Sequence, residues 1–147
     1  MLVAHVVTGE ALVARVLQEG RSWGTEVDPS ILGLDPMAAW RGTALAALNA
    51  ASADGVLDAL HPHPMGDMPG GVLIGFRATE NLAHGWDLAQ ACGRDAELPE
   101  SLAERCLDFW LPLAGSDAMA GSFGPPVLPP EGASAGVRLL SLLGRTA

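Results

Sequence analysis

The sequence is poor in aromatic residues, cysteine and positive charge. Tyrosine is absent, and aromatic residues make up 5% of the chain. Its two cysteines, Cys92 and Cys106, form no CxxC pair and are too few for a disulfide framework, so we expect reduced thiols that pack as small apolar residues. Lys and Arg number 8 against 17 Asp and Glu. Because phosphate contacts need clustered cations, this composition argues against nucleic-acid binding.

The sequence also lacks long apolar runs and targeting signals. No run approaches the ~20 residues that a membrane-spanning helix needs. The apolar first residues have neither the basic region nor the cleavage pattern of a signal peptide. We therefore predict a cytoplasmic protein that has no membrane partner. No internal repeat or change of composition divides the chain, so residues 1–147 are predicted to form a single domain.

Alanine and leucine, in contrast, are abundant, and they are among the best helix formers. With a hydrophobic fraction of 49%, they predict an all-α fold with a sizeable core, a small helix bundle. Apolar spacing predicts helices over residues 1–19, 36–53, 70–91, from 99 to about 113, and 134–143. Gly- and Pro-rich stretches predict irregular chain over residues 20–34 and 115–132, and a small hairpin could form within residues 56–69.

The second predicted helix has large apolar residues on one side. This side is expected to pack into the core, and it comprises Met37, Trp40, Ala44, Leu48 and Ala51. We interpret Trp40 as a core residue, although it could also contact a substrate.

Two histidines lie close together after this helix. His61 and His63, two positions apart, could share one side of a strand and bind a metal ion. The flanking prolines restrict the backbone rotation that would turn both imidazoles toward one ion, so a solvated Pro-rich loop is the preferred interpretation.

The third predicted helix contains polar residues on its apolar side. Glu80, His84 and Asp87 project within about 60° of one another on a wheel that advances ~100° per residue. The same side carries Leu73, Phe76, Leu88 and Ala91. An unpaired carboxylate there would cost several kcal/mol or more. A Glu and a His one turn apart could instead bind a shared metal ion, which would compensate the charge.

A third candidate ligand is His5, which lies next to Leu2 and Val6 on the apolar side of the first predicted helix. An isolated histidine in this position usually makes one hydrogen bond. With Glu80 and His84, however, it would complete a set suited to Zn²⁺, Ni²⁺ or Fe²⁺ and leave open positions on the metal. Asp87 either orients a ligand from the second shell or caps helix structure. Arg77 could meet an anionic substrate, but a surface position or a pairing with a nearby carboxylate is the preferred interpretation.

Three stretches of the chain together resemble the DinB-like metal-binding proteins, and more closely the branch related to mycothiol-dependent maleylpyruvate isomerase. They are Leu2-Val-Ala-His5-Val-Val, Glu80-Asn-Leu-Ala-His84-Gly-Trp86-Asp87-Leu-Ala and Phe123-Gly-Pro-Pro…Arg138-Leu-Leu-Ser-Leu-Leu-Gly-Arg145. The resemblance implies a DinB-type four-helix bundle that holds a divalent metal, usually zinc, through His5, Glu80 and His84. It also implies a low-molecular-weight thiol, such as mycothiol, as cosubstrate.

The chain departs from this family in two places. Family members carry one more helix before the histidine motif, and the chain begins inside a helical pattern without an N-cap. Val137 stands where an acidic residue is frequent. A bundle with its first helix missing would expose apolar surface, which predicts a possible homodimer.

Three functional hypotheses follow from the residues and the resemblance. The first is a metal- and thiol-dependent S-transferase or isomerase that acts on small electrophiles. The second is a non-catalytic metal-binding or stress-related bundle protein. In the third, the protein is a plain helical bundle in which His5, Glu80 and His84 only make hydrogen bonds. We rank metal binding above the third hypothesis and catalysis first.

Overall fold

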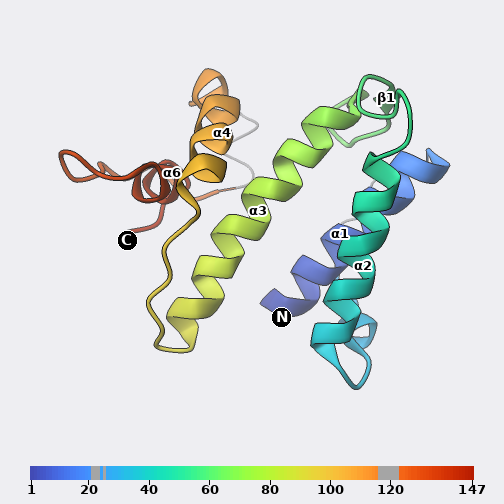
Figure 1. Ribbon diagram of the computed structural model, residues 1–147, viewed down its shortest axis with the longest axis horizontal. Coiled ribbons are helices and arrows are strands. Elements are labelled where there is room, and N and C mark those ends of the chain that lie inside the picture. The colour runs from blue at the N-terminus through green and yellow to red at the C-terminus, as the bar shows by residue number, and fades with distance from the viewer. Residues whose placement is uncertain (21–23, 25, 116–122) are drawn as a thin grey trace. The chain divides into compact units, whose positions relative to one another are not determined.

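The computed structural model describes residues 1–20, 24, 26–115 and 123–147, and it is mostly helical (Figure 1). The described α-helices are α1 (Leu2–Glu19), α2 (Pro36–Ala51), α3 (Gly70–Ala91), α4 (Glu100–Trp110) and α6 (Ala135–Leu142). Short 3₁₀ helices are η1 (Pro29–Leu32) and η2 (Leu111–Leu113). Two short antiparallel strands, β1 (Leu60–His61) and β2 (Met68–Pro69), pair Leu60 with Pro69 and His61 with Met68. The predominance of helix and the small hairpin are confirmed.

Local signals determine where the helices begin and end. The side chain of Asp35 accepts hydrogen bonds from the backbone amides of Met37 and Ala38, both at 3.0 Å, and Pro36 occupies the first turn of α2. Helix α1 ends at Glu19 and is followed by Gly20, whose φ of 60° is in the left-handed region that favours glycine. Within the predicted irregular segment 20–34, residues 29–32 form η1. Residues 21–23, 25 and 116–122 of the two predicted irregular segments lie outside the described part of the chain.

The chain divides into two compact units, Met1–Glu80 and Asn81–Ala147, and the boundary falls inside the continuous helix α3. In the first unit, α1 packs along α2 and against the beginning of α3 (Figure 1). The core of this unit consists of Val13, Ala14, Val16 and Leu17 from α1, Ala47 and Ala50 from α2, Val56, and Leu73 from α3. Burial of these side chains is the main stabilising contribution of the unit.

The predicted apolar side of α2 is confirmed at Ala51, which packs against the core, but it is wrong for the large residues. Met37, Trp40 and Leu48 are 54%, 39% and 63% exposed, and α2 meets the core through Ala47 and Ala50 instead. Because α2 is apolar around most of its circumference, its largest side chains do not determine which face is buried. Ala47 and Ala50 lie in the core cluster, whereas Trp40 is exposed and is therefore not a core residue.

The second unit is built by α4 and α6. Leu107 and Trp110 of α4 and Leu139 and Leu140 of α6 are buried. Trp110 makes an edge contact with Phe123 at 5.2 Å between ring centroids, a favourable geometry for aromatic pairs. Neither cysteine forms a disulfide. Cys106 is buried as expected, but Cys92 is exposed because it follows the last residue of α3. No helix in the described ranges combines the length and apolar character needed to cross a bilayer.

Candidate metal centre

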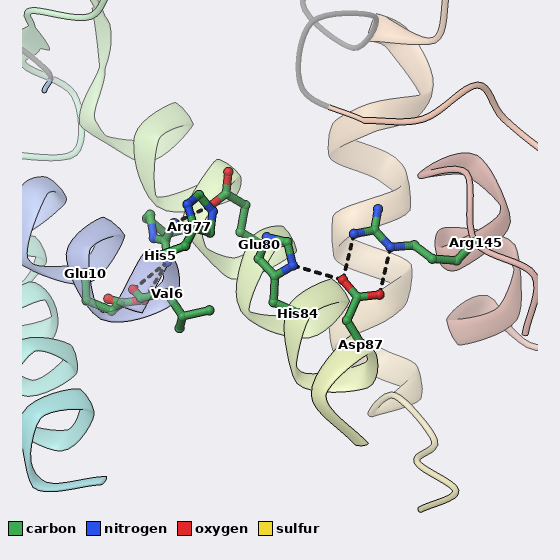
Figure 2. Close-up of polar contacts among 8 residues, drawn as sticks. All are labelled: His5, Val6, Glu10, Arg77, Glu80, His84, Asp87 and Arg145. Carbon is green, nitrogen blue, oxygen red and sulfur yellow. Dashed lines mark hydrogen bonds and ion pairs between the residues drawn. The ribbon is translucent and has the colours of Figure 1, made fainter. Parts of the chain in front are cut away.

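Glu80 and His84 lie one turn apart on α3, and His5 approaches from the second turn of α1 (Figure 2). His5 Nε2 lies 3.5 Å from Glu80 Oε2. One potential ligand atom from each of the three residues lies within 4.8 Å of the other two, so this cluster could hold a metal ion. The residues that the sequence predicts to converge are therefore brought together.

The chemistry of these donors fits a divalent transition metal. Two imidazoles and one carboxylate form a set typical of catalytic zinc sites. Atoms bound at about 2 Å to a shared ion lie at most ~4 Å apart. His5 Nε2 and Glu80 Oε2, 3.5 Å apart, fall within this limit. The side chains of His5, Glu80 and His84 are 44%, 27% and 15% exposed. The centre is thus accessible from solvent, as a site with open coordination positions must be.

Asp87 connects His84 to the tail of the chain. His84 Nδ1 lies 3.0 Å from Asp87 Oδ2, and Arg145 donates from Nε to Oδ1 at 3.2 Å and from Nη2 to Oδ2 at 2.8 Å. Burial alone would raise the pKa of Asp87, but hydrogen bonds and charge from Arg145 and His84 outweigh burial and lower it. An ionised Asp87 accepts a hydrogen bond from Nδ1–H of His84, which leaves the lone pair of Nε2 for a metal.

Arg77 is buried next to the candidate ligands. Its side chain is 5% exposed, and its Nη1 forms a hydrogen-bonded ion pair with Glu80 Oε2 (Figure 2). Its Nη2 donates to the carbonyl of Val6 at 3.3 Å and to Glu10 Oε1 at 3.4 Å. The predicted pairing with a nearby carboxylate is confirmed, and a surface position is wrong. The interior position is possible because two carboxylates compensate the charge.

Two proteins of Mycobacterium tuberculosis are similar to the chain. The uncharacterized proteins MT0763 (strain CDC 1551 / Oshkosh) and Rv0738 (strain ATCC 25618 / H37Rv) are each 35% identical to it over 121 residues. The alignment covers 82% of the chain and 59% of each relative, so the chain spans less than two thirds of their length. No protein-family model matches the chain, and no solved structure matches it significantly. The resemblance to the DinB-like family stays a prediction.

His61 and His63 do not join the candidate centre. His61 is buried, and its Nε2 is 2.9 Å from the carbonyl oxygen of Val56. The His63 ring packs tilted on Phe76 with centroids 5.8 Å apart, and burial lowers the pKa of His63. Within the described ranges, neither histidine belongs to a group of potential metal ligands. The preferred interpretation as a solvated Pro-rich loop is wrong for His61, which is buried in strand β1. His63 lies in the irregular chain that follows this strand.

Glu10 is the residue near the centre that the sequence interpretation missed. Its side chain is 5% exposed, although it is acidic and comes from the middle of α1. A signal was present, because Glu10 lies one turn after Val6 and one turn before Val13 on the apolar side of α1. A carboxylate at such a position predicts a buried partner, as it does for Glu80.

Proposed function

We propose that the protein binds a divalent metal ion, most suitably Zn²⁺, through His5, Glu80 and His84. The observation that carries this proposal is the convergence of these three side chains from two helices. Ni²⁺ and Fe²⁺ are also compatible with two imidazoles and a carboxylate. The geometry and the three sequence motifs together support membership of the DinB-like family of four-helix bundle proteins. Within it, we assign the protein to the branch of mycothiol-dependent maleylpyruvate isomerase.

The activity that we propose is a thiol-dependent S-transfer or isomerisation of a small electrophile, with mycothiol or a similar thiol as cosubstrate. A zinc ion would supply stabilisation of the thiolate, which is the nucleophilic form of the thiol. His5 and His84 contribute neutral donors and Glu80 one negative charge, so the site would retain positive charge for an anionic sulfur. Asp87 holds the imidazole of His84 in the tautomer that this role needs.

A second candidate function is metal binding without catalysis, as in a sensor or stress-related protein. One observation favours it: the charged residues around the three ligands are engaged with one another. Glu10 and Glu80 pair with Arg77, and Asp87 pairs with Arg145. Groups held in this way are not turned toward an approaching substrate, so thiol dependence must separate the two functions.

The metal site is tested by elemental analysis of untagged protein. We expect about one equivalent of metal per chain, its loss in His84→Ala, and its retention in the control His63→Ala. His63 is a suitable control because it is a histidine of the same chain outside the cluster. Equal metal content in wild type and His84→Ala would refute the site.

The proposed activity is tested with metal-loaded protein, mycothiol and small electrophiles such as maleylpyruvate. Turnover should require both the thiol and the metal, and it should be lost in His84→Ala. If metal-loaded protein neither binds mycothiol nor supports turnover, the enzyme proposal fails and the non-catalytic function stands.

A further inference from the structure

Helix α1 forms a socket for the side chain of Arg77. We define the socket as three groups of α1: the carbonyl of Val6 and the carboxylate of Glu10, both shown in Figure 2, and the backbone of Gly9. The guanidinium lies directly on Gly9, because a Cβ there would fall within 2.8 Å of Arg77 Nη2 and even closer to Nη1. A methyl group at residue 9 would therefore displace the guanidinium.

Each part of this socket taken alone lowers the stability of the fold. Glycine inside a helix is less favourable than alanine by about 0.5–1 kcal/mol. A buried carboxylate or guanidinium loses its hydration and is tolerated only with a close partner. The side chains of Glu10 and Arg77 are both 5% exposed, and they satisfy this condition for each other. The arrangement therefore favours one placement of the Arg77 guanidinium.

The other end of that guanidinium holds a candidate metal ligand. Nη1 binds Glu80 Oε2, the same oxygen that lies 3.5 Å from Nε2 of His5. His5 belongs to α1, directly before Val6 of the socket. Arg77 thus connects the Glu80 carboxylate to the helix that carries His5. The side chain of Glu80, with three rotatable bonds, would otherwise adopt many rotamers.

We propose that Arg77 is a positioning residue of the metal centre and that the socket on α1 holds it in place. This role rests on the proposed metal binding. Arg77 fixes the rotamer of Glu80 and the position of its carboxylate relative to the imidazole of His5. Glu10 cancels the charge of Arg77, so the pair adds no net charge near a dication that a lone arginine would repel. A residue that acts through a ligand in this way resembles other outer partners of metal sites, whose loss typically costs 10–100-fold in affinity.

A double-mutant cycle on the full chain separates this role from a merely structural one. Zinc affinity is measured by chelator competition for wild type, Arg77→Lys, Glu80→Gln and the double variant. Lysine keeps the charge but loses the planar fork that binds two partners at once. Arg77→Lys should bind zinc at least about tenfold more weakly. In the Glu80→Gln background it should cause no further loss, because its effect passes through Glu80.

Arg15→Lys is the matched control, since Arg15 is an exposed arginine of α1. It should leave zinc affinity unchanged. The positioning role is refuted if the zinc affinity of Arg77→Lys stays within about threefold of wild type. It is also refuted if the affinity loss of the double variant equals the product of the losses of the two single variants. Wild-type protein that binds no zinc would instead refute the metal centre itself, which is a different result.

Circular dichroism and thermal unfolding show whether each variant is folded. Where Arg77→Lys does not fold, the double variant Glu10→Gln/Arg77→Gln decides, because it leaves no unpaired buried charge. It preserves the net charge of the pair and all three ligands. Its zinc affinity should also fall at least about tenfold, and wild-type affinity in this variant would overturn the proposal.

Discussion

At the scale of single residues, Asp87 determines which nitrogen of His84 faces the candidate centre. It accepts from His84 Nδ1 and is itself held by two nitrogens of Arg145. Asp87→Asn removes the negative charge and weakens the preference for the Nδ1–H tautomer. We therefore expect zinc affinity to fall about 10–100-fold, measured by chelator competition, while the helical circular dichroism signal is retained.

Asp108→Asn is the control for this substitution. Asp108 is an exposed aspartate of α4 in the same compact unit, and it lies outside the candidate centre. Its replacement should not change zinc affinity. The same affinity in Asp87→Asn and Asp108→Asn would show that Asp87 does not support the metal ligand.

The sequence predicts some residues of the centre and not others, for a physical reason. Glu80 and His84 could be predicted because one turn of a helix places them together, whatever the rest of the fold does. His5 could be added because a histidine near an incomplete pair of ligands is informative. The pairing of Arg77 with Glu10 joins positions 67 residues apart, so it depends on how α1 and α3 pack. Local spacing carries no information on that contact.

At the scale of elements, helix boundaries could be predicted better than buried faces. The predicted helix over residues 70–91 agrees with α3 (Gly70–Ala91), and Asp35 and Pro36 mark the beginning of α2 through local hydrogen bonds and a fixed backbone angle. The buried face of a helix is harder to predict than its ends, because that face depends on the element against which the helix packs. Where a helix is apolar on most sides, as α2 is, the pattern does not identify the side that packs.

Two glycines of α3 should respond in opposite ways to the same substitution. A Cβ on Gly70 would overlap the backbone carbonyl oxygen of Val56 and lie 3.2 Å from His61 Nε2. A Cβ on Gly85 would meet no atom within 4 Å. Gly70→Ala should therefore lower the free energy of unfolding by about 1–3 kcal/mol through overpacking. Gly85→Ala should raise it by about 0.5–1 kcal/mol, because alanine loses less conformational entropy in a helix.

Urea unfolding of both variants, followed by circular dichroism, measures these changes against wild type. Each variant serves as the control for the other, since both replace glycine by alanine in one helix. Stabilisation by Gly70→Ala would show that the contact between α3 and Val56 is not tight. Destabilisation by Gly85→Ala would show that its exposed position is packed in solution.

At the scale of the whole molecule, the outer side of α2 is an unusual surface for a chain with a net charge of −9. Met37, Leu45 and Leu48 lie within about 80° of one another on the helix wheel, and all are more than half exposed. Arg41, the single charged residue of α2, projects between Leu48 and Leu45 on the same arc, and α2 carries no carboxylate. Contiguous exposed apolar side chains of this kind typically mark an interface.

We propose that this surface associates with the same surface of a second copy, because a two-fold contact brings identical apolar faces together. The expected result is a dimer of the wild-type chain in size-exclusion chromatography with light scattering. Leu45→Glu combined with Leu48→Glu should produce a monomer, since burying four carboxylates in a two-fold interface is prohibitively costly. Leu128→Glu alters an exposed leucine in the other compact unit and should leave the dimer intact. A monomeric wild type, or a dimer that survives both substitutions in α2, would contradict this interface.

Because substitutions on the outer side of α2 spare all three candidate ligands, zinc content should remain at the wild-type value in the monomeric variant.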